Sequence, residues 1–197
     1  MRRVAAVLVH HPVLDRQGNV VTTAITNLDL HDIARSAHTY GLGGLYVAHP
    51  VAAQRELALR IREHWISGSG ARRIPDRSPP MRAIEIVESL DDAIAALGGR
   101  AAVELWTTSA REAAAPMLDY PAAAERLRRD GPAVLIVFGT GWGLADEVLA
   151  QADAQLGAIV SPRQDGYNHL SVRAAAAIMF DRLLSPGAKA PTAPGTA

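Results

Sequence analysis

Short apolar runs recur along the chain and alternate with segments in which apolar residues return every three or four positions. Residues 4–9 are apolar without a break, which is typical of a strand buried on both faces of a sheet. Shorter or less regular runs predict further strands at residues 44–48, 82–87, 102–106, 133–138 and 155–160.

The segments between these runs have the periodicity of amphipathic helices. They predict helices at residues 29–40, 51–66, 89–97, 120–129, 144–151 and 168–184. Asn27 or Asp29 is expected to cap the first of these helices. The remaining long stretches, residues 10–26 and 68–80, are predicted to be loops.

Strands that alternate with helices predict an α/β fold with a mostly parallel, six-stranded sheet and helices on both faces. Ligands of such sheets bind where the carboxyl ends of the strands meet, so the loops after residues 9, 106, 138 and 160 are the first place to look for a site. We expect a single domain at residues 1–184 and a flexible tail at residues 185–197, where Pro, Gly, Ala and Thr predominate.

Composition narrows the possible chemistry. The 197 residues include 20 basic and 20 acidic residues and no cysteine. The absence of cysteine excludes disulfide scaffolds, cysteine-ligated metals and cysteine nucleophiles, and no apolar run approaches the roughly 20 residues that cross a bilayer. His10 and His11 point to opposite faces of an extended strand end, so no metal site is expected. We expect a cytoplasmic protein that does not interact with a membrane.

A glycine-rich segment follows the predicted strand at residues 133–138. Gly139, Gly141 and Gly143 alternate with other residues, and glycines in this density let a backbone approach a ligand closely. Their spacing is not the Gly-x-Gly-x-x-Gly of dinucleotide-binding folds, and no Gly-Lys-Ser/Thr of a phosphate-binding loop follows. The alternative interpretation is a tight turn between a strand and a helix that binds nothing.

Several segments, taken in order, share residues with one enzyme superfamily. Asn27 precedes Ile33-Ala34-Arg35, Phe138-Gly139 precedes Gly143-Leu144, and His169-Leu170-Ser171 opens the last predicted helix. Residues 106–111, Trp-Thr-Thr-Ser-Ala-Arg, follow the fourth predicted strand. These segments resemble the SPOUT superfamily of S-adenosylmethionine-dependent RNA methyltransferases, and within it stand-alone proteins related to domains fused to the tRNA guanine-N1 methyltransferase. The resemblance covers residues 3–184.

Two positions depart from the pattern of the superfamily. The glutamate of its middle segment is absent, and Gly141 or Trp142 stands there. His169 takes the place of an asparagine in the last segment, unless Asn168 has that role through a shift of one residue.

The resemblance implies a C-terminal trefoil knot, S-adenosyl-L-methionine as the cofactor, structured RNA (tRNA or rRNA) as the substrate, and a homodimer. The alanine-rich last helix also favours a homodimer, because it is apolar on nearly all sides of its middle. Methyl transfer to RNA is the leading hypothesis. The alternative is a non-catalytic SPOUT-like domain that binds S-adenosylmethionine or RNA, which the missing glutamate favours and the retained Arg35 and Ser171 oppose. A third hypothesis, a nucleotide-dependent enzyme unrelated to RNA, holds only if all these motif matches are accidental.

The resemblance also implies the residues of the site. Arg35, Asn27 and Ser171 are expected to act on the substrate. A guanidinium stays protonated, so Arg35 is expected to neutralise a phosphate or to stabilise developing charge. The residues expected to contact the cofactor are Thr107, Ser109, Phe138, Gly139, Thr140, Gly141, Trp142, Gly143, Leu144, Ile159, Ser161, Asn168, His169 and Leu170.

Arginine is concentrated between residues 55 and 82, where seven arginines stand against three acidic residues. Arg72, Arg73 and Arg77 lie in the predicted loop at residues 68–80, and we expect them to bind RNA phosphates. For the arginines of the preceding helix, RNA binding and a solvated face with internal ion pairs are equally good interpretations.

Overall fold

The centre of the molecule is a sheet of seven strands, described in a computed structural model that covers residues 1–109 and 116–186. The strand order is β5–β4–β1–β8–β6–β9–β7, and the neighbouring strands run parallel. The strands are β1 (Val4–Val9), β4 (Leu45–Ala48), β5 (Ile84–Val87), β6 (Val103–Thr108), β7 (Met117–Leu118), β8 (Ala133–Gly139) and β9 (Ala154–Leu156). The predicted α/β class and parallel sheet are confirmed.

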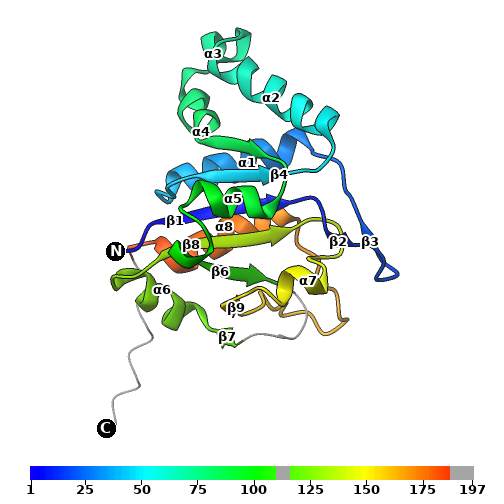
Figure 1. Cartoon of the computed structure of the whole chain (residues 1–197), viewed down its shortest axis with the longest axis vertical. Coiled ribbons are helices and arrows are strands. Elements are labelled where there is room, and N and C mark those ends of the chain that lie inside the picture. Colours follow the sequence, from blue (N-terminus) through cyan, green and yellow to red (C-terminus); the bar gives the residue numbers. More distant parts are fainter. Residues whose placement is uncertain (110–115, 187–197) are drawn as a thin grey trace.

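Helices cover both faces of this sheet (Figure 1). The helices α1 (Asn27–Thr39), α6 (Tyr120–Arg128) and α8 (Val172–Leu184) share one core with Ala6 and Leu8 of β1. The helices α5 (Leu90–Ala96) and α7 (Asp146–Leu149) share the other core with Ala5 and Val7. Successive strand residues point to opposite faces, and both faces are covered, which explains why β1 is apolar throughout.

A helical arm extends beyond the β5 edge of the sheet, at the top of Figure 1. It consists of α2 (Ala52–Ile66), α3 (Ser69–Arg73), the 3-10 helix η1 (Pro75–Arg77) and α4 (Ser78–Arg82). The prediction of a loop at residues 68–80 was therefore wrong. Prolines are tolerated in the first turn of a helix, where the missing N–H has no intrahelical partner. Helices of three to five residues are also too short to show a periodic pattern.

Very short strands account for the other differences. The strands β2 (Val13–Leu14) and β3 (Val20–Val21) form an antiparallel hairpin inside the predicted loop at residues 10–26. The strand β7 makes seven strands where six were predicted. Strands of two residues give no alternating pattern.

The ends of three elements also differ from the prediction. The strand predicted at residues 155–160 is β9, which ends at Leu156. The helix α8 begins at Val172 rather than at residue 168, because the Ser171 hydroxyl caps it by accepting from the Ala174 amide. Thr26, and not Asn27 or Asp29, caps α1. Residues 187–197 of the predicted tail, and Ala110 and Arg111, lie outside the described residues.

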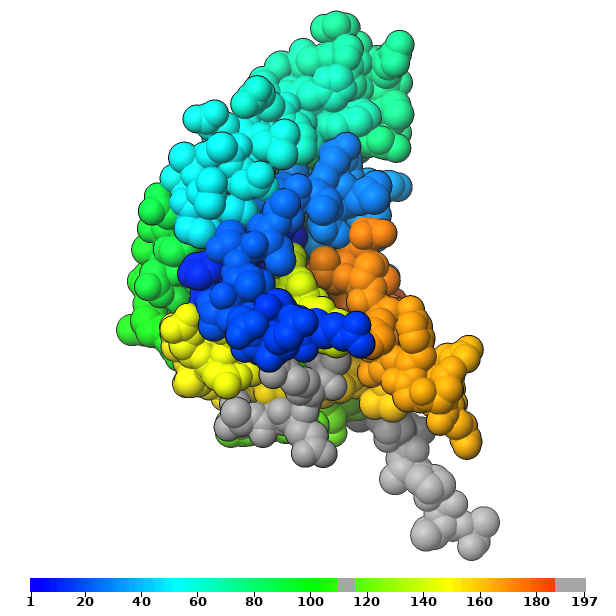
Figure 2. Space-filling view, turned by 90° about the vertical axis from the view of Figure 1, so that its right-hand side faces the viewer, coloured from blue at the N-terminus to red at the C-terminus, as the bar shows by residue number. Residues whose placement is uncertain are grey.

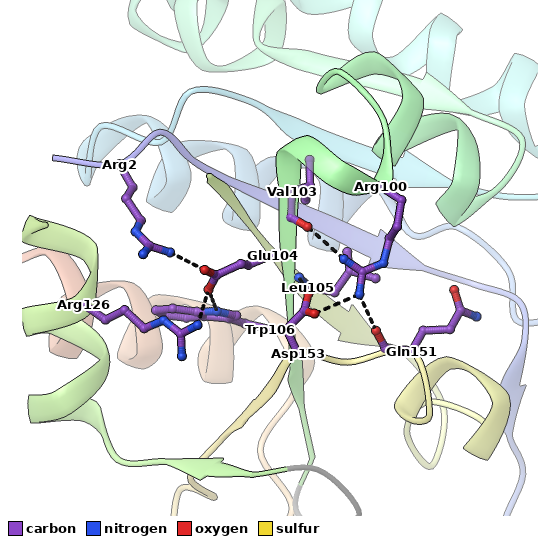
Figure 3. A network of polar contacts seen from close by, with 9 residues as sticks. All are labelled: Arg2, Arg100, Val103, Glu104, Leu105, Trp106, Arg126, Gln151 and Asp153. Carbon is purple, nitrogen blue, oxygen red and sulfur yellow. Dashed lines mark hydrogen bonds and ion pairs between the residues drawn. The ribbon is translucent and has the colours of Figure 1, made fainter. Parts of the chain in front are cut away.

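Glu104 holds the amino end of β6 in a polar network (Figure 3). Its carboxylate accepts from Arg2 at 2.6 Å and from the Trp106 indole at 3.1 Å, and it pairs with Arg126 at 2.8 Å. Burial opposes ionisation of Glu104, but these hydrogen bonds outweigh it and lower the pKa of the carboxyl below its usual value. The carboxylate is therefore charged and paired at neutral pH.

Asp153 extends this network toward β9. It accepts from the Leu105 amide at 2.7 Å and from Arg100 at 3.0 Å, and Arg100 also donates to the carbonyl oxygens of Val103 and Gln151 (Figure 3). Burial again opposes ionisation, and the bonds from Arg100 and Leu105 lower the pKa of Asp153. Together these contacts fix the start of the central strands. In the described part of the chain, no helix is both long and apolar enough to cross a membrane.

Candidate functional site

A cleft of about 810 Å³ opens at the carboxyl ends of β6 and β8. Three stretches of chain form most of its wall: Thr23 to Asp29 before and at the start of α1, Phe138 to Gly143 at the end of β8, and Ile159 to Ala175 leading into α8. Thr108, Ser109 and Met179 complete the lining. The cleft therefore lies at the sheet edge where the parallel topology predicts ligands to bind.

The glycine-rich turn after β8 is held against the β2–β3 hairpin. The Trp142 amide donates to the Leu14 carbonyl, and the Leu14 amide donates to the Gly143 carbonyl, both at 2.9 Å. Gly141 has φ +60°, and a Cβ added there would lie 2.8 Å from the Leu14 carbonyl oxygen. At Gly139 an added Cβ would lie 2.8 Å from the Leu144 amide nitrogen. The turn itself therefore requires these glycines, and the same turn lines the cleft.

An acidic residue and a basic residue meet in the wall of the cleft. Asp29 is buried at the start of α1, where the Thr26 hydroxyl donates to it at 2.6 Å. Arg173 of α8 donates to Asp29 at 3.2 Å and lies 3.4 Å from the Asp32 carboxylate. Arg173 was absent from the sequence predictions, and Asp29 was considered only as a helix cap. One feature of the sequence indicated that Arg173 belongs to the site, namely its position two residues after Ser171.

A buried histidine stands behind the cleft wall. His10 Nδ1 lies 3.1 Å from the Thr23 hydroxyl, which contacts the Thr140 hydroxyl, and Thr140 donates to the Val9 carbonyl at 3.2 Å. Because Thr140 donates to a carbonyl, it accepts from Thr23, and His10 Nδ1 then carries the proton. Burial, assisted by the neighbouring His49, lowers the pKa of His10 to about 4, so the ring is neutral at neutral pH. Among the described residues, its Nε2 is buried without a partner.

The structure brings most of the predicted site residues to this one cleft. Those that line it are Ser109, Phe138, Gly139, Thr140, Gly141, Trp142, Gly143, Ile159, Asn168, His169, Leu170 and Ser171. Their roles toward a ligand stay predictions. Sequence reasoning did not include Thr23, Ala24 and Thr26, which line the cleft from the segment before α1.

Five of the residues predicted to contact the cofactor or to act on the substrate do not line the cleft. Thr107 and Leu144 are buried beneath it, since Leu144 belongs to the core and Thr107 is 1% exposed. Ser161 lies in the adjoining loop, and Asn27 is the exposed first residue of α1. Arg35 is exposed on α1, away from the lining.

The three arginines predicted to bind RNA differ in their surroundings. Arg72 and Arg73 are exposed on α3, at the end of the helical arm and away from the β2–β3 hairpin in Figure 1. Arg77 is half-buried, and its guanidinium lies 4.9 Å from the centre of the Trp65 ring. Arg77 therefore already packs within the arm. Within residues 1–109 and 116–186, no group of three or more His, Cys, Asp or Glu side chains is placed to hold a metal ion.

Comparison with known proteins agrees with this architecture. Residues 3–185 match a family model described as SAM-dependent RNA methyltransferase. A tRNA (guanine-N(1)-)-methyltransferase of Nitratidesulfovibrio vulgaris is 45% identical over 187 residues, which are 93% of this chain and 42% of that protein. An uncharacterized protein of Aquifex aeolicus is 34% identical over 181 residues, which are 90% of this chain and 86% of that protein.

Among solved structures, TrmJ from Z. mobilis has the same fold, with a TM-score of 0.62 at 19% identity. The match covers 96% of this chain and 72% of that chain. The chain spans less than half the length of the Nitratidesulfovibrio relative.

Proposed function

Because the chain belongs to the family of S-adenosylmethionine-dependent RNA methyltransferases, we propose that it transfers a methyl group from S-adenosylmethionine to structured RNA, with tRNA as the first substrate to test. The observation that carries the proposal is the cleft at the carboxyl ends of β6 and β8, where three separate segments with family motifs meet. The sequence-based identification as an S-adenosylmethionine-dependent RNA methyltransferase is confirmed. The C-terminal trefoil knot is part of the proposal.

The cleft fits S-adenosylmethionine in size and chemistry. Its volume of about 810 Å³ lies in the range of sites for small ligands, which is roughly 300–1,000 Å³. Phe138, Ile159 and Met179 offer an apolar wall for the adenine ring, and Thr140 and Asn168 offer polar groups for the ribose and the amino acid. When bound, S-adenosylmethionine supplies an electrophilic methyl group on a sulfonium.

The residues of the chain then have to bind and orient the RNA. Arg173 presents a guanidinium in the cleft wall, and its pairing with Asp29 and Asp32 holds it in place. A guanidinium so fixed can present its remaining N–H donors to a neutral acceptor of the substrate. Ser171 accepts from the Ala174 amide, so its hydroxyl hydrogen stays available for the substrate.

We include a homodimer in the proposal, because Arg35 lies outside the cleft of its own subunit. Leu28 of α1 is 59% exposed, and Ala174, Ala177 and Ile178 of α8 are only partly buried. The helices α1 and α8 pack together, and we infer that a second copy covers these residues. Across a two-fold axis, Arg35 can reach the substrate in the cleft of the other subunit.

Mixing two inactive variants tests this arrangement. Arg35→Ala removes the guanidinium, and Ala24→Trp fills the cleft from a lining position. If Arg35 acts across the dimer, mixed dimers contain one cleft that is both open and served by an arginine. Co-purified variants should then regain part of the methyl-transfer activity. No regain in a mixture shown by mass spectrometry to contain mixed dimers would contradict the arrangement.

The experiment that tests the function itself is methyl transfer to RNA from a strain that lacks the gene. Total tRNA and rRNA are incubated separately with the protein and labelled S-adenosylmethionine, and digested nucleosides are identified by mass spectrometry. We expect one methylated nucleoside to appear in tRNA. Binding of S-adenosylmethionine without incorporation into either RNA would instead favour the non-catalytic alternative.

A further inference from the structure

Three aromatic side chains stand in a row at the edge of the cleft. The centre of the His169 ring lies 5.5 Å from that of the Trp142 ring and 5.4 Å from that of the Tyr167 ring. Both contacts have edge-to-face geometry. Trp142 is 51% exposed and Tyr167 is 60% exposed. We call Trp142, Tyr167 and His169 the aromatic rim. A group of exposed aromatic rings next to a cleft indicates a binding surface.

The aromatic rim is fixed at Trp142. The residue stands between Gly141 and Gly143 in the turn whose backbone is bonded to Leu14 on both sides. The positive φ of Gly141 and its contact with the Leu14 carbonyl leave this turn little freedom. A ring on such a base is positioned before any ligand arrives, which reduces the entropic cost of binding.

A cation accompanies the aromatic rim. The guanidinium carbon of Arg16 lies 6.0 Å from the centre of the Trp142 ring. Arg16 follows Asp15, whose carboxylate is already occupied by Asn19 and by the Gln17 amide. Among the described residues, Arg16 has no ion pair with a carboxylate. Figure 2 shows the blue segment around the β2–β3 hairpin next to the orange segment that leads into α8.

We propose that the aromatic rim and Arg16 bind an unpaired nucleotide of the RNA substrate, with its base stacked on Trp142 or Tyr167 and its phosphate on Arg16. The proposal rests on the proposed function and adds where and how the RNA is held. Flat aromatic faces bind every base, and a neighbouring guanidinium binds the phosphate, which is how proteins recognise single-stranded segments of RNA. A target nucleotide held there lies beside the cleft in which the methyl donor is proposed to bind.

The alternative occupant of the aromatic rim is a second copy of the chain. The cation and the position beside the cleft favour RNA, because an apolar protein interface would leave Arg16 without a charged partner. If RNA occupies the aromatic rim, variants of the rim should change the affinity for RNA, and if a second copy occupies it, they should change the dimer equilibrium. One set of variants therefore distinguishes the two occupants.

The test uses a single-stranded RNA oligonucleotide that carries one 2-aminopurine, whose fluorescence falls when the base stacks on an aromatic ring. Tyr167→Ala and Arg16→Ala are the main variants, since neither residue lines the cleft. Trp142→Phe and Trp142→Leu compare a ring with an apolar side chain that cannot stack. Met117→Ala and Arg129→Ala serve as controls, because these are an exposed apolar residue and an exposed arginine on other elements.

We expect the wild-type protein to quench the 2-aminopurine, Tyr167→Ala to bind the oligonucleotide roughly ten-fold more weakly, and Trp142→Leu to lose most of the quenching that Trp142→Phe retains. Arg16→Ala should weaken binding several-fold, and the salt dependence of binding should become shallower. Affinity for S-adenosylmethionine, measured by calorimetry, should be unchanged in Tyr167→Ala and Arg16→Ala, and both controls should behave as wild type.

Wild-type binding and quenching in both Tyr167→Ala and Trp142→Leu would overturn the proposal. So would a change of the dimer equilibrium in Tyr167→Ala, measured by sedimentation, with unchanged affinity for the oligonucleotide. If the wild-type protein binds the oligonucleotide through the rim but methylates no RNA, the inference is supported and only the proposed catalysis fails.

Discussion

The two ends of the parallel sheet differ in how completely their buried polar side chains are paired. At the amino end, the carboxylate of Glu104 is bonded by three side chains, and that of Asp153 by a guanidinium and a backbone amide. At the carboxyl end, His10 Nε2 and Thr107 Oγ1 are buried without partners among the described residues. Arg2 Nε is the one atom of the amino-end network in the same state.

This difference separates the part of the sheet that maintains the fold from the part that binds. Removal of one member of a paired, buried charge destabilises the fold, because its partner is left without a bond. Unsatisfied groups cost stability, and proteins retain them mainly where a ligand or a reaction needs them. We therefore expect variants at the amino end to change unfolding alone, and variants at the carboxyl end to change binding or methyl transfer in addition to any change in unfolding.

The largest effect is expected from Arg35→Ala. Loss of the guanidinium should lower methyl transfer by roughly 10²-fold or more while the affinity for S-adenosylmethionine is retained, as measured by calorimetry. Arg35→Lys should rescue poorly, because a lysine lacks the planar arrangement of donors. A rate equal to that of the wild type would remove Arg35 from the mechanism, and unfolding of the variant would make its role structural.

A large loss of stability is expected from Glu104→Gln. This change leaves Arg2 and Arg126 without their carboxylate, and it should lower the free energy of unfolding at pH 7 by about 3 kcal/mol in urea titrations. The pKa of Glu104 is lowered in the folded state. Its contribution to the free energy of unfolding is therefore present at neutral pH and is lost as the pH falls below about 4.5 toward the pKa of the folded state.

The control for this prediction is the affinity for S-adenosylmethionine. The folded Glu104→Gln protein should bind the cofactor as the wild type does, because the network lies at the opposite end of the strands. Equal stability of the two proteins at pH 7, or a loss of affinity in the folded variant, would contradict the separation of the two ends.

A smaller effect is expected from the pH dependence of stability at the carboxyl end. His10 has its pKa lowered to about 4 by burial, whereas an unfolded histidine titrates near 6.5. The contribution of neutral His10 to the free energy of unfolding is therefore present above pH 6.5 and is lost as the pH falls. The free energy of unfolding should decrease by about 2 kcal/mol between pH 8 and pH 5. Burial lowers the pKa of His49 in the same direction. In urea titrations, the free energy of unfolding of His10→Gln should depend less steeply on pH than that of the wild type. An unchanged slope would contradict the role assigned to His10.

The smallest stability effect is expected at the start of α8. Ser171→Ala removes the cap and should cost about 1 kcal/mol, whereas Ser171→Gly should cost only a few tenths. Both variants lack the hydroxyl, and we expect both to transfer methyl groups roughly ten-fold more slowly. Thermal unfolding and single-turnover rates measure the two effects separately. Wild-type turnover in Ser171→Gly would leave Ser171 only its capping role.

The long elements could be predicted from the sequence, because burial on both sides of the sheet leaves a continuous apolar run in β1 and a periodic pattern in α8. The helical arm and the β2–β3 hairpin could not, since elements of two to five residues are too short to repeat any period. Their formation depends on packing and on tertiary hydrogen bonds.

The candidate site divides in the same way. The segments around Phe138 and His169 carry family motifs, and they lie in the cleft. Asp29 and Arg173 are separated by 144 positions and gain significance only from their contact across α1 and α8. Arg77, which the sequence analysis expects to bind RNA, packs on Trp65, a contact that the sequence alone did not indicate.

The most direct test of the central claim is hydrogen exchange of the full chain with and without S-adenosylmethionine, measured by mass spectrometry. We predict that the cofactor slows exchange in peptides that cover residues 138–144 and 159–172, and leaves unchanged the peptides that cover the Glu104 network and α3. Slower exchange confined to the helical arm or to the amino ends of the strands, or no change at a saturating concentration of cofactor, would contradict the assignment of the cleft.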